Sequence, residues 1–223
     1  MFILGYILTA AAAYLLGSIP TGYLVGRQRG VDIRTAGSGN IGATNVFRIL
    51  GKPAGICVLL LDALKGFAAV ALVLKYYREL NEFLPQMFPV DAFALPAVRL
   101  NYAILAGVCA VIGHNYTCWL GLKGGKGIAT SAGVYLALAP LAMSIALGVW
   151  ILLFVVSRYV SIASIAAAVA LPTAVWFTTN SLCLGIVTTA LGVLAIYKHK
   201  SNIQRLLTGA ENRVHFKKEK TVT

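Results

Sequence analysis

The chain has 223 residues, of which 59% are hydrophobic and 12% are charged, and its mean hydropathy is +0.81. Since a globular domain carries roughly 25% charged residues, this composition excludes an ordinary water-soluble protein. It indicates an integral membrane protein with room for about six to seven spans of ~20 residues. The net charge of +12 would suggest nucleic acid binding in a soluble protein. Because cytoplasmic membrane loops collect Lys and Arg, we expect no nucleic acid partner.

The apolar runs place the predicted spans in chain order. The first run covers about residues 2–26, lacks a basic n-region and is too long for a signal peptide, so we interpret it as a retained span. A basic loop over 27–52 separates it from a second run at about 53–74. A mixed loop over 76–99 contains three prolines and precedes a third run at about 100–119.

The apolar stretch 127–157 is too long for one ordinary span. As a single helix its 31 residues would measure ~46 Å, against a hydrocarbon core of ~30 Å. Pro140 near its middle would kink or break such a helix. Either one kinked, steeply tilted helix or two short helices occupy this stretch. Two further runs follow, at about 160–178 and 182–197, before a basic tail.

The distribution of positive charge selects between these alternatives. The loop 27–52, the pair Lys123 and Lys126, and the tail are all basic, and the positive-inside rule places all three in the cytoplasm. Only the two-helix alternative satisfies this condition. We therefore predict an all-α polytopic membrane helix bundle, a single domain over residues 1–223. It has seven spans, the fourth and fifth short with Pro140 at their outer turn, the N-terminus outside and the C-terminus cytoplasmic.

A glycine-rich polar stretch, GLKGGKGIATSAG, covers residues 121–133. Glycines let the backbone approach an anion closely, and the helix start that follows adds a partial positive charge. Together with Lys123 and Lys126, this pattern indicates a phosphate-binding loop, although the Walker spacing is not met. The alternative is a flexible turn whose two lysines only set the topology.

A second polar stretch, GSGNIGATNVFR, covers residues 37–48 and ends in an arginine. Ser38 or Asn40 is positioned to cap a short helix that stops at Gly51. Arg48 would lie near the membrane interface, and arginine is suited to bidentate phosphate binding. The alternative, an interfacial helix anchored by its arginine, leaves the density of Ser, Asn and Thr unexplained.

Single titratable residues give weaker signals. Asp62 and Lys65 lie three residues apart in the second run, so they can pair on one helix face, and a packing role and a direct function stay open. His114 and His199 lie beside the polar stretches, and a histidine with Asn202 could position or deprotonate a hydroxyl. The sequence contains no H-E-x-x-H pattern, no paired Cys and His and no G-x-S-x-G motif, so we expect no metal and no cofactor.

The chain resembles the bacterial acyl-phosphate-dependent glycerol-3-phosphate acyltransferases in four stretches: GSIPTGYLVGR, GSGNIGATNVFR, GHNYTCWLGLKGGKGIAT and HKSNIQRLLTGAEN. The resemblance implies transfer of a fatty acyl group from acyl phosphate to the 1-hydroxyl of sn-glycerol 3-phosphate, which gives lysophosphatidate and phosphate without a metal. It implies the first acylation step of phospholipid synthesis, in the bacterial inner membrane, with the active site on the cytoplasmic face.

The resemblance also assigns roles to residues. His199 and Asn202 are expected at the reacting centre. The expected substrate-binding residues are Ser38, Asn40, Arg48, Lys123, Gly124, Gly125, Lys126 and Ser161. The expected partners are the two substrates and membrane lipid, and docking of the enzyme that makes acyl phosphate stays open. The alternative function, a transporter of organic phosphate esters, should carry polar sites near the midplane in both halves, whereas here the polar stretches cluster on one face.

Overall fold

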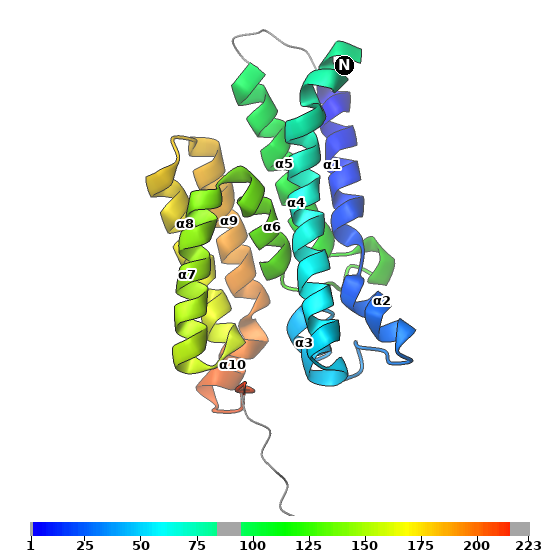
Figure 1. Cartoon of the computed structure of the whole chain (residues 1–223), viewed down its shortest axis with the longest axis vertical. Coiled ribbons are helices and arrows are strands. Elements are labelled where there is room, and N and C mark those ends of the chain that lie inside the picture. The colour runs from blue at the N-terminus through cyan, green and yellow to red at the C-terminus, as the bar shows by residue number, and fades with distance from the viewer. Residues whose placement is uncertain (1, 84–94, 215–223) are drawn as a thin grey trace, which may run out of the picture.

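The structure is a computed structural model that describes residues 2–83 and 95–214. Within these ranges all regular secondary structure is helical. Figure 1 shows an elongated bundle whose longer helices run roughly along one axis. The predicted all-α bundle is therefore confirmed.

The first apolar run forms α1 (Phe2–Ser18) and, after a break at Ile19 and Pro20, the short helix α2 (Thr21–Gln28). The break is expected at this position because proline lacks an N–H and disfavours helical backbone in the residue before it. A loop then leads to α3 (Ala43–Leu50), which ends at Gly51 with a φ of 85°. Glycine adopts this left-handed backbone without strain, so the predicted end of the helix is confirmed.

The start of α3 differs from the prediction. Gly42 is the N-cap residue, and no side chain caps the helix. The side chain of Asn40 instead accepts a hydrogen bond from the Gly42 N–H (2.8 Å), and the Ser38 N–H donates to Oδ1 of Asn45 (2.9 Å). These bonds fold the loop before the helix, so Ser38 and Asn40 belong to that loop.

Two long helices follow, α4 (Lys52–Phe83) and α5 (Leu95–Asn115). The predicted loop over 76–99 is wrong at both ends, because α4 continues through Phe83 and α5 already begins at Leu95. The middle of that predicted loop, residues 84–94, lies outside the described residues. Residues 118–120 form a single 3₁₀ turn after α5.

The stretch 127–157 forms two helices, as predicted, α6 (Ile128–Leu138) and α7 (Pro140–Ser157). Pro140 is the first residue of α7, a position where a missing N–H leaves no intrahelical bond unmade. The expected short length holds for α6, which has 11 residues, but not for α7, which has 18 and is long and apolar enough to cross a membrane.

The chain ends in three helices, α8 (Val160–Thr178), α9 (Leu182–Lys198) and α10 (Lys200–Leu207). The last two are bent by 52° at His199. Among the described helices, five segments can cross a membrane by length and composition, and the bent pair makes up to six. Large apolar side chains cover the outside of these helices, as on the lipid-facing surface of a multi-pass membrane protein.

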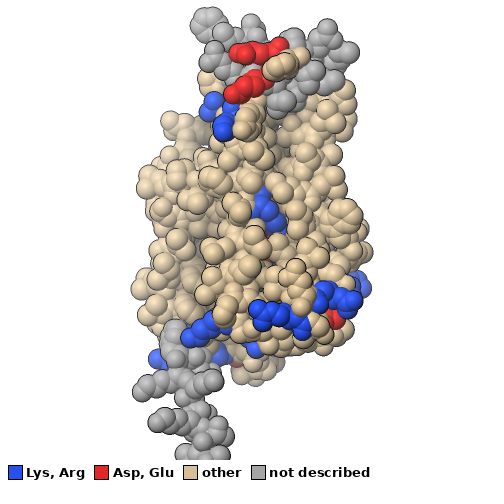
Figure 2. Space-filling model, turned by 45° about the vertical axis from the view of Figure 1, so that its right-hand side comes forward, with Lys and Arg blue, Asp and Glu red and all other residues tan. Residues whose placement is uncertain are grey.

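Close helix contacts hold α6 against the middle of α4. A Cβ atom on Gly66 would lie 2.1 Å from the carbonyl oxygen of Thr130, and one on Gly133 would lie 1.8 Å from that of Ala63. Only glycine permits this approach. Figure 1 places α2, α3 and α10 together at the end opposite the N-terminus, and Figure 2 shows a belt of Lys and Arg across one face of this end. The predicted polar stretches gather there as well.

Candidate active site

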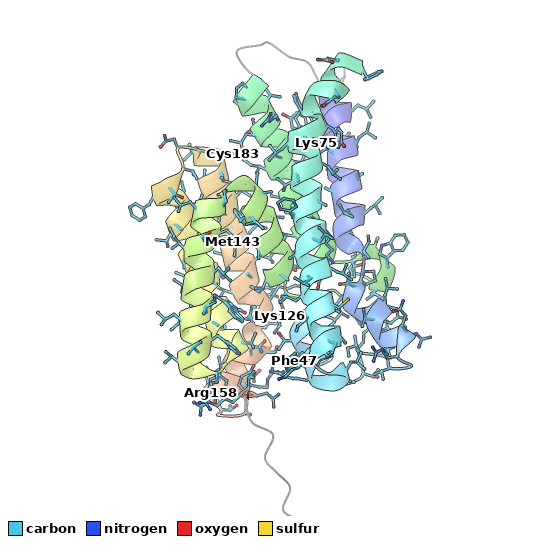
Figure 3. All side chains as sticks on the ribbon, viewed as in Figure 1. Phe47, Lys75, Lys126, Met143, Arg158 and Cys183 are labelled. Atoms are coloured by element: carbon cyan, nitrogen blue, oxygen red, sulfur yellow. The ribbon has the colours of Figure 1, made fainter. Side chains whose placement is uncertain are left out.

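A cavity of 290 Å³ lies between α3, α4 and the four helices α6 to α9. Its polar end is lined by Ser38, Asn40, Arg48, Lys126, Ser161, His199, Asn202 and Glu211. The rest is an apolar arm between α6 and α9, whose lining includes Met143, Leu171 and Leu191. Figure 3 shows Lys126 at the foot of α6 and Met143 farther along the bundle. The cavity thus joins a basic polar pocket to an apolar channel.

Glu211 connects three parts of the polar end. One carboxylate oxygen, Oε1, accepts hydrogen bonds from Nδ2 of Asn202 (2.8 Å) and from the hydroxyl of Ser161 (3.1 Å). The other, Oε2, accepts from Nε of Arg205 at 2.7 Å. Burial alone would raise the pKa of Glu211, but these bonds outweigh it and hold the pKa below its usual range. The carboxylate is therefore charged and fixes the segment after α10 to α8.

Lys126 is half-buried in the loop just before α6, and its amine donates a hydrogen bond to Oδ1 of Asn202. Burial lowers the pKa of Lys126 to about 8, and the positive charges of Arg205 and Arg48 act in the same direction, whereas Glu211 opposes them. The Asn202 amide therefore bridges Lys126 and Glu211. This bridge holds the Lys126 amine at the cavity, where its lowered pKa lets it lose its proton more readily than an exposed lysine.

His199 lies at the bend between α9 and α10 and is buried against the cavity. Its Nδ1 lies 2.8 Å from the carbonyl oxygen of Ala195. Because a carbonyl can only accept, Nδ1 carries the proton in this bond and Nε2 keeps a lone pair. The bend therefore presents a histidine with one nitrogen available as an acceptor.

Arg48 reaches the cavity from the last turn of α3. The helix is held in place by Asn45, whose side-chain amide donates to the carbonyls of Ile33 (3.2 Å) and Ala36 (3.0 Å). A close contact between Gly55 and Phe47 brings α3 against α4. The polar stretch over residues 37–48 thus supports Arg48 and also brings Ser38 and Asn40 to the cavity lining.

Three predicted substrate-binding residues do not line the cavity. Lys123 is exposed and lies outside the cavity lining. The N–H groups of Gly124 and Gly125 donate to the carbonyls of Asn115 (3.2 Å) and His114 (3.0 Å), so they are already used within the protein. Neither N–H is left to donate to a phosphate in this arrangement, and the substrate-binding roles of Lys123, Gly124 and Gly125 stay predictions. The glycines instead let the loop pack on the end of α5, which positions Lys126.

The cavity lining also contains residues whose contacts or presence the motifs did not predict. The Ser161 hydroxyl lines the cavity but donates to a carboxylate. Glu211, Asp62 and His114 line the cavity although none was assigned to the site. The sequence offered one indication of Glu211, since the chain has only seven acids and this one lies in a polar motif. Among the residues that the structure describes, no three His, Cys, Asp or Glu side chains form a metal-ligand group.

The family model for glycerol-3-phosphate acyltransferase matches residues 7–209 of the chain. The chain belongs to this family. The predicted acyltransferase activity, which forms lysophosphatidate in phospholipid synthesis, is thereby confirmed. The family match does not support the alternative function, a transporter of organic phosphate esters.

Several relatives in the glycerol-3-phosphate acyltransferase family cover nearly all of the chain. The enzyme of Synechococcus sp. (strain JA-2-3B'a(2-13)) is 46% identical over 210 residues, which are 93% of this chain and 94% of the relative. That of Trichlorobacter lovleyi is 45% identical over 203 residues, or 91% and 94%.

Two crystal structures of PlsY (YgiH), an integral membrane glycerol 3-phosphate acyltransferase, are similar to this fold. The glycerol 3-phosphate form has a TM-score of 0.81 and 36% identity, and the match covers 94% of this chain and 96% of that one. The lysophosphatidic acid form has a TM-score of 0.78 and 35% identity, with 94% and 95% covered. The bundle observed here is therefore the architecture of this acyltransferase family.

Proposed function

We propose that this acyltransferase takes its acyl group from acyl phosphate and binds both substrates in the one cavity described above. The observation that carries the proposal is the junction of a polar end holding Arg48 and Lys126 with an apolar arm. Both substrates carry phosphate and the donor also carries a fatty chain. The reaction therefore needs cationic contacts beside an apolar channel, which this cavity supplies.

The apolar arm is long enough for a large part of a fatty chain. Its lining on α8 extends from Ser161 to Leu171, a rise of ~15 Å at 1.5 Å per residue. A saturated chain advances ~1.25 Å per carbon, from a C–C bond of about 1.5 Å and an angle of about 111°. The arm therefore accommodates roughly twelve carbons in extended form. The carbonyl of the donor would then lie at the polar end.

In the proposed mechanism the 1-hydroxyl of glycerol 3-phosphate attacks the carbonyl carbon of acyl phosphate directly. A new C–O ester bond forms, the C–O bond to phosphate breaks, and the phosphate leaves with the electron pair. Arg48 and Lys126 hold phosphate groups and stabilise the negative charge that develops. His199 accepts the hydroxyl hydrogen through Nε2 and so orients or deprotonates the nucleophile. Asn202 keeps Lys126 in place.

A covalent acyl-enzyme route has less support in this geometry. The Ser161 hydroxyl donates to Glu211, whose pKa lies below its usual range, so this carboxylate is a poor base for activating a serine. Acyl phosphate is a mixed anhydride and is already activated. The proposal therefore assigns the enzyme to positioning and charge stabilisation, with both substrates bound at once.

The donor and the order of reaction can be tested on the purified enzyme. With both substrate concentrations varied, initial-rate lines should intersect, and phosphate release from acyl phosphate should require glycerol 3-phosphate. Acyl-CoA of the same chain length serves as the matched donor control and should not support transfer. Parallel lines with an early burst of phosphate would indicate an acyl-enzyme and contradict direct transfer.

We also propose that the chain spans the membrane seven times, with the N-terminus outside and the active site on the cytoplasmic side. The helices α1, α4, α5, α6, α7, α8 and α9 alternate in direction (Figure 1), although α6 rises only part of the way. The basic belt of Figure 2 lies at the end that holds α2, α3 and α10. The positive-inside rule supports a cytoplasmic position for that end.

Single-cysteine labelling tests this orientation in a background without Cys57, Cys109, Cys118 and Cys183. In right-side-out vesicles, an impermeant thiol reagent should label Glu79→Cys at the outer end of α4 but not Gly209→Cys after α10, because the basic end faces the cytoplasm. Gly209→Cys should become reactive once the vesicles are opened. Labelling of Gly209→Cys in sealed vesicles would refute the proposed orientation.

The pKa of Lys126 predicts a pH dependence. Its ammonium form binds phosphate, and burial lowers its pKa to about 8. Since the charge is present below this pKa and lost above it, kcat/KM should fall by roughly tenfold between about pH 7 and pH 9. Lys126→Arg, whose guanidinium stays charged, should lose this decline while retaining measurable activity. A wild-type profile that stays level over this interval would contradict the prediction.

A further inference from the structure

A buried group of charged and polar side chains lies beside the loop that carries Lys126, and two of its members, Asp62 and His114, also line the cavity. Asp62 and Lys65 on α4 and His114 on α5 are only 1%, 5% and 4% exposed. The Lys65 amine lies 2.8 Å from Oδ1 of Asp62, and Nδ1 of His114 lies 3.5 Å from the same oxygen. The hydroxyl of Thr21 donates to this oxygen as well. One carboxylate therefore joins α2, α4 and α5.

The Asp62–Lys65 pair is anchored at the break between α1 and α2. The Lys65 amine donates to the carbonyl oxygen of Ile19 at 2.8 Å, and Thr21 is the first residue of α2. The broken helix thus supplies to the buried charges a hydroxyl and a carbonyl, which also accepts the Thr21 N–H at 3.0 Å. A buried pair with such partners has a defined geometry, because each change of position would leave a charge or a polar group unmatched.

The same group contacts the loop before α6. The carbonyl oxygen of His114 accepts the Gly125 N–H at 3.0 Å, and a Cβ atom on Gly125 would lie 2.1 Å from Nε2 of His114. The next carbonyl, that of Asn115, accepts the Gly124 N–H at 3.2 Å. His114 therefore contacts this loop through its backbone and through its ring. The residue that follows Gly125 is Lys126.

We propose that Asp62 and His114 are positioning residues that set the place of the Lys126 amine in the active site, an inference that rests on the phosphate-binding role proposed for Lys126. Asp62 lies within ion-pair distance of Nδ1 of His114, which has no hydrogen-bond partner, and the ring packs against Gly125. A change at Asp62 therefore shifts the amine relative to the phosphate group. Since a displacement of about 1 Å can cost about 10²-fold in rate, the effect on catalysis is large although it is transmitted through the loop.

A double-mutant cycle tests this chain of contacts. Asp62→Asn should lower kcat/KM by roughly 10- to 100-fold in the wild-type background. In the Lys126→Ala background the same change should lower it by less than about twofold, because the group being positioned is absent. Equal losses in both backgrounds would show that Asp62 acts on the substrate or on the fold, and would overturn the proposal. Full activity of Lys126→Ala alone would instead refute the role of Lys126 on which the proposal rests.

Thermal unfolding of each variant in detergent separates positioning from stability. Val70→Ala, on the same helix and fully buried away from this group, is the matched control. It should lower Tm and leave the kinetic constants unchanged.

If Asp62→Asn does not fold, the pair Asp62→Leu and Lys65→Met removes both buried charges without leaving one unpaired. This double variant should fold and should still show a reduced kcat/KM. The reduction should again be much smaller in the Lys126→Ala background than in the wild-type background. Wild-type kinetics in the folded pair would overturn the proposal.

Discussion

Replacement of His199 by alanine should slow acyl transfer by roughly 10²- to 10⁴-fold, the range for a positioned general base. The expectation follows from the bend between α9 and α10, where the Ala195 carbonyl holds Nδ1 and leaves Nε2 as an acceptor beside the cavity. Nothing in this arrangement makes His199 a contact for the leaving phosphate. Binding of acyl phosphate should therefore be nearly unchanged.

The measurement is single-turnover transfer with pre-bound acyl phosphate, together with the dissociation constant of the donor. Tyr197→Phe, at an exposed position two residues earlier, is a control for disturbance of the helix end and should behave as wild type. A rate within about threefold of wild type for His199→Ala would assign the proton to the departing phosphate and remove His199 from the chemistry.

Replacement of Arg48 or Lys126 by alanine should each lower kcat/KM by roughly 10- to 150-fold, which corresponds to the 1.5–3 kcal/mol of a charge-assisted hydrogen bond. Arg48 lies on α3 and Lys126 in the loop just before α6, and both line the polar end of the cavity. Their removal takes away a phosphate contact and leaves the apolar arm intact. The loss should therefore affect substrates of every acyl length to a similar extent.

Lys200→Ala is the matched control for charge, since Lys200 is an exposed cation on α10 that lies over the ring of Tyr197. It should retain nearly full activity. All variants should insert and change Tm only slightly. Among the described residues neither Arg48 nor Lys126 forms a direct ion pair with an acid, and Lys126→Ala removes one hydrogen bond, to Asn202. Equal losses at all three positions would mean that these residues act only as topology charges.

The membrane class and the order of the helices could be predicted from the sequence. Apolar runs of about twenty residues have one favourable environment, the hydrocarbon core, and a helix there must satisfy its own backbone. Pro140 also marked the break between α6 and α7, because proline cannot donate within a helix. The lengths were less predictable, and α4 runs through the segment assigned to a loop as far as Phe83.

The polar motifs predicted which residue types belong to the site but not which of them face it. The structure brings Arg48, Lys126, His199 and Asn202 to one cavity, as the motifs suggested. It does not bring Lys123 there. Sequence spacing carries no information on the direction of a loop side chain. That direction was decided by the packing of the glycine loop on the end of α5.

The sequence by itself determined that this is a helical membrane protein with basic, polar loops at one end, because hydropathy and charge act on each segment separately. Only the tertiary structure decided which distant residues share a hydrogen bond or a charge. Glu211 meets Ser161 across 50 residues of chain, and Asp62 meets Thr21 across 41. Such buried polar partners are chosen by the packing of the helices, since a buried charge is stable only where the fold supplies its counterpart.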